Sequence, residues 1–243
     1  MSINAGEKMI TEDLGKREQA KAERRHRIVR AARDLIRETG DTDLSMRKLA
    51  QRAEVSLSTP YNLFGSKRAV VLAVLEDERD FAKRFRKLDS GNSIERIFGA
   101  HELAFSYYTG DPDFYRTLWR ALLSTSGHDD TGLATPERLA QTRAIWLGLL
   151  GNAARDGFLS KDVPVELIVQ TMAQITGGAL LSWAVGSLST SALTPTVGIG
   201  YALCLTGASN LSGKGLLRSK MSAYQSELST GGSGETEYSP ETM

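Results

Sequence analysis

The chain has 243 residues, of which 41% are hydrophobic and 24% are charged, and its formal net charge is +1. This composition is ordinary for a globular protein, and no apolar run approaches the roughly 20 residues of a membrane-spanning helix. The single cysteine, Cys204, excludes an internal disulfide. The polar first thirty residues lack a secretion signal, so we expect a cytoplasmic protein with one or two domains and no membrane partner.

The charge is unevenly distributed along the chain. Residues 1–88 contain 20 Lys and Arg against 14 Asp and Glu, a net charge of +6. Residues 89–243 contain 10 against 15, a net charge of −5. A basic first third can bind a polyanion such as a nucleic acid. The same charges can equally lie on solvated helix faces, so charge alone leaves both interpretations open.

The apolar residues recur at helical spacing almost throughout, and clean period-two strands are absent, so we expect an all-α fold. Flexible polar tails are expected at residues 1–20 and 225–243. Gly40 is a natural helix stop, and Ser45 and Ser66 are natural N-caps. A first domain, residues 21–88, is therefore predicted to hold helices at 21–39, 46–53, 56–64 and 67–88.

Residues 89–224 predict a larger helical domain. Pro112, Pro136 and Pro195 each fit the first turn of a helix. The Gly- and Asp-rich stretch 124–132 predicts a loop. Further helices are expected at 94–108, from 112, from 136, at 165–188, and from 194 onward.

Residues 45–64 have the length and pattern of a helix-turn-helix. In this motif two short helices pack on a longer first helix, and the second short helix enters a DNA groove. Its outward positions here are small or polar, and Leu57 can contact a thymine methyl group. These outward residues are Leu57, Ser58, Thr59, Tyr61 and Asn62.

The segment LAQRAEVSLSTPYNLFGSKRAVV, residues 49–71, resembles the signature of the tetracycline-repressor (TetR) family. The similarity rests on the alanine-rich second helix, the Val-Ser turn, the Tyr-x-x-Phe pair and the following Ser-Lys, and it extends over residues 24–74. It implies a homodimeric transcriptional regulator, by default a ligand-released repressor, that binds a palindromic operator in double-stranded DNA. Carried over by position, it implies base contacts from Arg47 and the start of the third helix, and phosphate contacts from Ser45, Thr59, Tyr61 and Lys67.

Three positions depart from the family pattern, one of them Leu63, where the family often has histidine. Glu54 stands in the turn where many members have glycine, which is tolerable if the backbone there is not left-handed. Pro60 takes a place usually held by leucine or isoleucine. Proline is least harmful in a first helical turn, but it disfavours helix in the residue before it. The exact start of the third helix is therefore left open.

The second domain is rich in aromatic residues, which at helical spacing usually form a core. The resemblance implies instead a pocket for a largely apolar small molecule, with candidates His101, Phe105, Tyr108, Trp119 and Trp146. It also implies a dimer interface on the last two main helices, with candidates Gly177, Gly178, Trp183 and Gly200. Packing within one subunit is the alternative for this second group.

An enzyme is not expected. The histidines His26, His101 and His128 fall in different predicted elements, and no metal-ligand spacing, P-loop or dinucleotide fingerprint occurs. We therefore expect no metal and no cofactor. The alternative function is a helical small-molecule carrier or adaptor that does not bind DNA, which salt-dependent binding to duplex DNA would distinguish.

Overall fold

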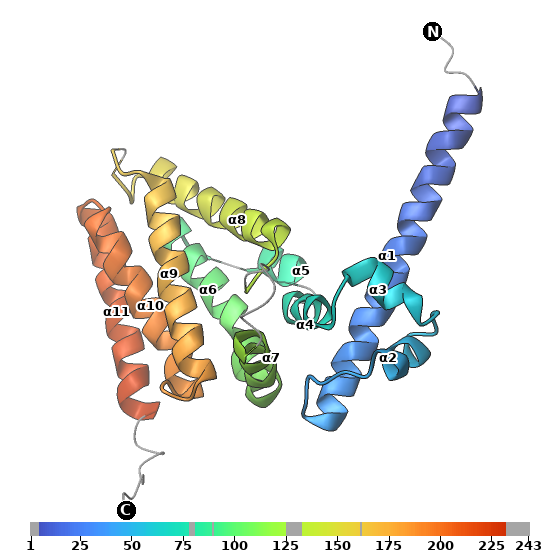
Figure 1. The fold of residues 1–243 in the computed structure, drawn as a ribbon. Helices are drawn as coiled ribbons and strands as arrows, with labels where there is room; N and C mark the ends of the chain where they lie inside the picture. The colour runs from blue at the N-terminus through green and yellow to red at the C-terminus, as the bar shows by residue number, and fades with distance from the viewer. Residues whose placement is uncertain (1–4, 78–80, 89, 125–132, 161, 232–243) are drawn as a thin grey trace, which may run out of the picture. The chain divides into compact units, whose positions relative to one another are not determined.

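The computed structural model describes residues 5–77, 81–88, 90–124, 133–160 and 162–231 (Figure 1). The expected all-α class is confirmed: this part of the chain forms helices and no β-strand, apart from a single β-bridge between Leu159 and Ser209. None of its helices has both the length and the apolar character required to cross a bilayer. The helices are α1 (Ala5–Thr39), α2 (Met46–Arg52), α3 (Ser58–Phe64), α4 (Lys67–Glu76), α5 (Phe81–Arg86), α6 (Ser93–Gly110), α7 (Pro112–Ser124), α8 (Pro136–Arg155), α9 (Val165–Ala184), α10 (Thr190–Gly207) and α11 (Leu211–Gly231).

The chain divides into two compact units. The first, here called the head, comprises residues 1–77 with 121–134, and the second, here called the body, comprises 78–120 with 135–243. The N-terminal segment of the head therefore ends at Asp77, whereas the first domain was expected to end at residue 88. Most of the loop predicted at 124–132 lies outside the described residues.

One face of α1 forms the centre of the head. Ile28, Ala32 and Ile36 are at most 1% exposed, and α1 contacts α2, α3 and α4. Leu49 from α2 and Val74 from α4 are completely buried. Because burial of apolar surface is the main stabilising contribution to a small helical unit, this face of α1 holds the three shorter helices in place.

The helices α2, α3 and α4 begin close to their predicted starts. The two N-caps are confirmed, since the Ser45 and Ser66 hydroxyls accept the N–H groups of Lys48 (3.4 Å) and Ala69 (3.1 Å). Helix α3 begins at Ser58, so Pro60 is its third residue. A proline there removes an N–H that has no partner inside the helix, which is why the helix tolerates it.

Both chain ends are more helical than expected. Helix α1 begins at Ala5, although a flexible tail was expected over residues 1–20. Helix α11 continues to Gly231, beyond the expected end at 224. Both segments lack a repeating apolar face, so the apolar periodicity that predicts helices does not detect them.

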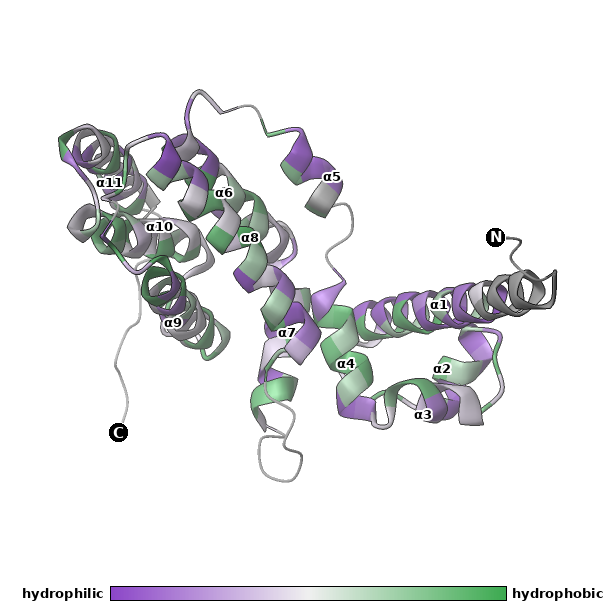
Figure 2. Ribbon diagram, turned by 90° about the horizontal axis from the view of Figure 1, so that it is seen from above, coloured by the Kyte–Doolittle hydropathy of each residue, from purple (hydrophilic) through white to green (hydrophobic). Residues whose placement is uncertain are grey.

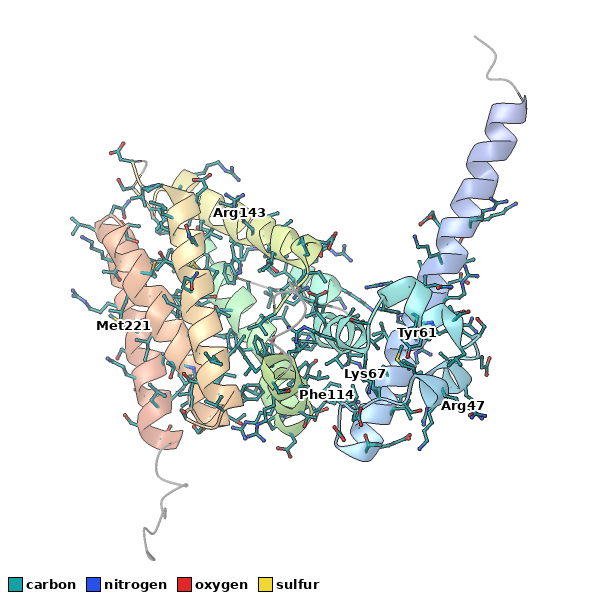
Figure 3. All side chains as sticks on the ribbon, viewed as in Figure 1. Arg47, Tyr61, Lys67, Phe114, Arg143 and Met221 are labelled. Atoms are coloured by element: carbon teal, nitrogen blue, oxygen red, sulfur yellow. The ribbon has the colours of Figure 1, made fainter. Side chains whose placement is uncertain are left out.

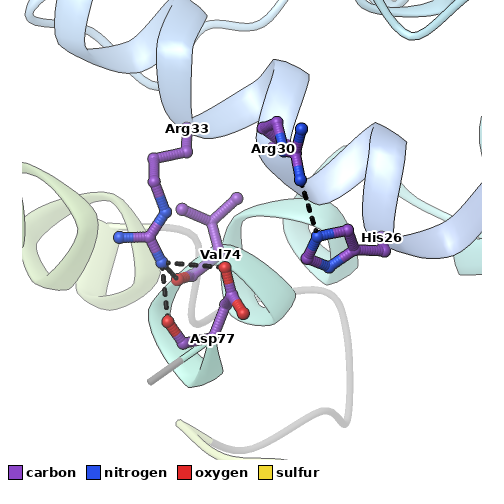
Figure 4. A network of polar contacts seen from close by, with 5 residues as sticks. All are labelled: His26, Arg30, Arg33, Val74 and Asp77. Atoms are coloured by element: carbon purple, nitrogen blue, oxygen red, sulfur yellow. Dashed lines mark hydrogen bonds and ion pairs between the residues drawn. The ribbon is translucent and has the colours of Figure 1, made fainter. Parts of the chain in front are cut away.

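The predicted helix 67–88 is interrupted, because α4 ends at Glu76 and α5 begins at Phe81. Arg33 Nη2 donates hydrogen bonds to the carbonyl oxygens of Val74 (3.1 Å) and Asp77 (2.8 Å) and to the Asp77 carboxylate (3.2 Å) (Figure 4). The arginine therefore satisfies carbonyl groups that a continuing helix would have bonded internally. The prediction of one continuous helix was wrong for this reason.

In the body, α10 contacts α6, α9 and α11. A Cβ at Gly198 would lie 2.4 Å from the ring of Tyr224 on α11, so the glycine allows these two helices to approach closely. Helix α10 starts at Thr190 with Ser189 as its N-cap, one turn before the start predicted at residue 194. Pro195 thus lies inside the helix rather than at its beginning.

Glu54, in the turn between α2 and α3, has a positive φ of 54°. The condition under which glutamate would be tolerable there, a backbone that is not left-handed, is therefore not met. A residue with a Cβ pays roughly 1–2 kcal/mol in this region, whereas glycine adopts it freely.

We expect Glu54→Gly to raise the free energy of unfolding by about 1 kcal/mol, because it removes this backbone strain. Gln51→Gly is the matched control, since Gln51 is exposed in α2 and should lose about 1 kcal/mol instead. Urea unfolding followed by circular dichroism measures both changes. Destabilisation of similar size in both variants would contradict the assignment of strain to Glu54.

Candidate nucleic-acid interface

The exposed face of α3 is the surface of the head best suited to enter a DNA groove. Leu57, at the N-cap, is 55% exposed and Tyr61 is 49% exposed, whereas Pro60 is buried. Ser58 and Asn62 are exposed as well. Because these outward side chains are small, polar or singly apolar, the helix can approach base edges closely.

Other residues predicted to contact DNA lie around this face. Arg47 on α2 is exposed and points away from the head (Figure 3). Ser45 uses its hydroxyl oxygen to cap α2 through Lys48, which leaves its O–H group to act as a donor. Thr59 is half-buried and its hydroxyl oxygen lies 2.7 Å from that of Ser56, so it is less accessible than its neighbours.

The C-terminal end of α3 is held by Arg25 of α1. Arg25 Nη1 donates to the Leu63 carbonyl oxygen (3.2 Å), and the guanidinium carbon lies 4.2 Å from the centre of the Phe64 ring. The arginine therefore satisfies a terminal carbonyl and adds a cation–π contact. The sequence signal was the arginine-rich first helix, but nothing in its spacing distinguishes Arg25 from the arginines beside it.

Lys67, predicted to contact phosphate, is paired with an acid inside the head. Its ammonium group donates to the carboxylate of Asp43, in the loop before α2. The hydrogen bond and the charge of Lys67 lower the pKa of Asp43. Lys67 is also the first residue of α4, where free backbone N–H groups favour an anion. A phosphate at this helix end would therefore compete with Asp43 for the lysine.

Four of the five pocket candidates form a connected aromatic cluster in the body. Ring centroids are 4.7 Å apart for His101 and Phe105 and 5.9 Å apart for Phe105 and Tyr108. Tyr201, which the sequence did not single out, links His101 (5.1 Å) to Trp146 (5.4 Å). The structure thus brings together candidates from α6 and α8 through a residue of α10.

His101 is fully buried and neutral in this cluster. Its Nε2 lies 2.9 Å from the Thr194 carbonyl oxygen, so Nε2 carries the proton and donates it. Burial lowers the pKa of His101 to about 4. Among the described residues, its Nδ1 has no hydrogen-bond partner.

The fifth candidate, Trp119 on α7, is 6% exposed, and its Nε1 likewise has no partner in the described part of the chain.

The four dimer-interface candidates fall into two groups. Gly177 and Gly178 are exposed on α9, and a Cβ at either would meet open space. Gly200 lies where a Cβ would be 2.7 Å from Ile175, so it serves the contact between α10 and α9. Trp183 is completely buried and donates from Nε1 to the Thr190 hydroxyl (3.1 Å). The side chain of Trp183 therefore belongs to the core of its own subunit, which differs from the expectation.

The described residues include no group of three or more His, Cys, Asp or Glu side chains placed to bind a metal ion.

Residues 28–74 match the family described as "Bacterial regulatory proteins, tetR family". A comparison with curated proteins found no match.

Three similar solved structures are regulators of this type. TylP from Streptomyces fradiae, a TetR regulator, is 18% identical, with a TM-score of 0.56 over 85% of this chain and 98% of its own. Thermus thermophilus FadR, a TetR family transcriptional repressor in complex with lauroyl-CoA, is 22% identical. The match covers 75% of this chain and 94% of FadR, with a TM-score of 0.58. A TetR transcriptional regulator from Rhodococcus sp. RHA1 is 19% identical. The match covers 76% of this chain and 97% of the Rhodococcus protein, with a TM-score of 0.58. The resemblance found in the sequence is thereby confirmed: residues 28–74 match the TetR family, and the chain has the fold of TetR-family transcriptional regulators.

Proposed function

We propose that the protein is a cytoplasmic, sequence-specific regulator that binds a palindromic duplex site as a homodimer and is released by a small molecule. The observation that carries the proposal is the exposed face of α3 in the segment that matches the TetR family. In this assignment Leu57, Ser58 and Asn62 read base edges from the major groove, and Arg47 joins them from α2.

Phosphate contacts on either side would set the position of α3 on the duplex. Tyr61 offers an exposed hydroxyl, and Lys67 offers a cation at the N-terminus of α4. Ser45 adds a donor at the start of α2. Contacts of this kind fix register and orientation but carry no sequence information. Thr59, half-buried and bonded to Ser56, is the weakest of the proposed contacts.

The homodimer is proposed to form through α9 and α10. These two helices contain a single charged residue, Glu166, although one face of α9 is exposed along its whole length. Leu203 and Gly207 of α10 are exposed as well. A long exposed face without charge is typical of a surface that another subunit covers. Six exposed residues of α9 and its C-cap repeat at intervals of four and three and are here called the α9 stripe: Leu167, Thr171, Gln174, Gly178, Leu181 and Val185.

A second copy of the chain is the occupant that suits the α9 stripe. One head supplies few base contacts, whereas two heads related by a two-fold axis can read both halves of a palindrome. The proposed interface keeps Gly177 and Gly178, which leave room for close helix approach. It omits Trp183, whose side chain is buried, and Gly200, which faces Ile175 of the same chain.

The proposed effector is a largely apolar molecule with a few polar groups, bound in the body. The support is the aromatic cluster around His101 and three buried polar atoms that have no partner within the described residues: His101 Nδ1, Arg116 Nε and Trp119 Nε1. Buried polar groups cost free energy unless they are hydrogen-bonded, so a ligand that meets them gains affinity. The similarly folded FadR is described in complex with lauroyl-CoA, whose acyl chain fits the apolar part of such a ligand.

The roles assigned to Lys67 and Arg47 are separable in binding experiments. We expect Lys67→Ala to weaken binding to all duplexes alike and to lower the slope of log K against log salt by about one. Arg47→Ala should instead relax preference at particular base pairs, by about 1–3 kcal/mol for a lost bidentate contact. Fluorescence anisotropy with a panel of single-base variants of the preferred duplex measures both effects. A change of base preference in Lys67→Ala with an unchanged slope would contradict the assignment.

Asp43→Asn should strengthen DNA binding roughly two- to fivefold, because it removes the carboxylate that competes with phosphate for Lys67. Asp41→Asn is the matched control, since it removes the same charge two residues away. Titrations of both variants with one duplex, at one salt concentration, give the comparison. Equal strengthening in the two variants would indicate only a general charge effect and would contradict the competition.

Leu181→Glu, which places a charge in the α9 stripe, should weaken the dimer by at least about thirtyfold, because a truncated or charged central contact costs about 2 kcal/mol or more. Analytical ultracentrifugation should find wild type as two 26.5 kDa chains and the variant as one. Leu139→Glu on α8 is the control: Leu139 is 60% exposed but lies outside the stripe, and its variant should remain dimeric. A dimeric Leu181→Glu variant would place the interface elsewhere.

Trp119→Phe should weaken effector binding about tenfold while leaving the free protein at least as stable as wild type, since it removes an N–H donor that is buried without a partner in the described structure. Lauroyl-CoA is the first compound to test, followed by other acyl thioesters, lipids, steroids and aromatic compounds, with tryptophan fluorescence as the readout. A true effector should also lower DNA affinity about 5–150-fold, and DNA should lower effector affinity equally. If none of these compounds changes the fluorescence or the DNA affinity, the result would favour a regulator without an effector.

A further inference from the structure

The first half of α1 extends beyond the rest of the head, and residues 15–27 of the helix are largely exposed. The buried face of α1 begins at Ile28, whereas residues 15–27 are exposed except for Ala20, which is half-buried. Figure 1 shows this half of α1 continuing past α2 and α3. A helix that buries so little surface within its own chain gains little stability from it, so an external contact is the natural explanation for its presence.

This exposed segment is strongly basic. Residues 15–27 contain six Lys and Arg against two Asp and Glu, and Figure 2 shows hydrophilic residues along much of α1. One of the acids, Glu18, lies 3.9 Å from Lys21 on the same side of the helix. The segment also lacks any apolar residue larger than alanine. It therefore has no face that could insert into a membrane, and its charge suits a polyanion instead.

Three of the cations lie on one side of α1, beside the residue that contacts α3. At 3.6 residues per turn, Arg17, Lys21 and Arg24 share one side of the helix, and Arg25 follows at its edge. Arg25 contacts Leu63 and Phe64 at the C-terminal end of α3, as described above. The three cations, here called the basic stripe, therefore extend along α1 from the C-terminal end of α3.

We propose that the basic stripe contacts the phosphate backbone of duplex DNA outside the half-site that α3 reads, an inference that rests on the proposed DNA-binding function. The eight residue steps from Arg17 to Arg25 rise about 12 Å, which corresponds to three or four base pairs of duplex. The stripe thus adds affinity without adding base recognition, and its contribution depends on the length of the DNA rather than on its sequence.

The test compares two duplexes and three proteins. One duplex contains only the preferred palindrome, and the other adds about ten base pairs of mixed sequence at each end. The proteins are wild type, Arg17→Gln/Lys21→Gln/Arg24→Gln, and a control that removes three exposed cations of the body, Arg143→Gln/Lys214→Gln/Arg218→Gln. Glutamine keeps high helix propensity, and circular dichroism verifies that helix content is unchanged.

We expect wild type and the control to bind the long duplex at least about tenfold more tightly than the short one, and the stripe variant to bind both equally. On the long duplex the variant should also lose about two to three units of salt slope, since three phosphate contacts are removed. A stripe variant that keeps the advantage of the long duplex would overturn the inference, as would stripe-dependent binding to anionic phospholipid vesicles without that advantage. If wild type binds neither duplex, the proposed function itself fails.

Discussion

The two helices that present the candidate interface have seven residues each, and neither is long enough to be stable on its own. Their geometry depends on one buried face of α1, formed by Ile28, Ala32 and Ile36. Arginines of the same helix hold the ends of its neighbours: Arg25 binds the last turn of α3, and Arg33 binds the last turn of α4. The first helix thus fixes both the position of the recognition surface and the point where α4 stops.

Under the proposed function, this rigid support would allow a small surface to recognise DNA. Side chains held by a packed backbone lose little further entropy on binding, so the few contacts of Leu57, Ser58 and Asn62 can be selective. Two features of the same region act against stability or affinity, namely the left-handed backbone at Glu54 and the pairing of Lys67 with Asp43. Local rules are most often broken at functional sites, and the concentration of both exceptions around α2 and α3 fits that pattern.

Much of this organisation could be predicted from local sequence. The helical periodicity, the caps at Ser45 and Ser66 and the Tyr-x-x-Phe pattern all act within a few residues, and they indicated the fold class and the outward face of α3. Features that depend on distant contacts could not be predicted in the same way. Arg33 ends α4 from 41 residues away, and no local signal such as glycine or proline marks the break. Trp183 was an interface candidate because the family resemblance implies a dimer interface on its helix, but its side chain is completely buried in the body.

The most direct test of the central claim, that the head reads duplex DNA as one half of a symmetric pair, is selection of bound sequences from random duplex DNA by the purified full-length protein. The account predicts enrichment of an inverted repeat whose half-sites are separated by a spacing that fits two-fold symmetry. Loss of that enrichment when Arg47 and Asn62 are replaced by alanine would tie it to the head. Recovery of no preferred sequence, or of single half-sites bound at full affinity by a monomer, would contradict the claim.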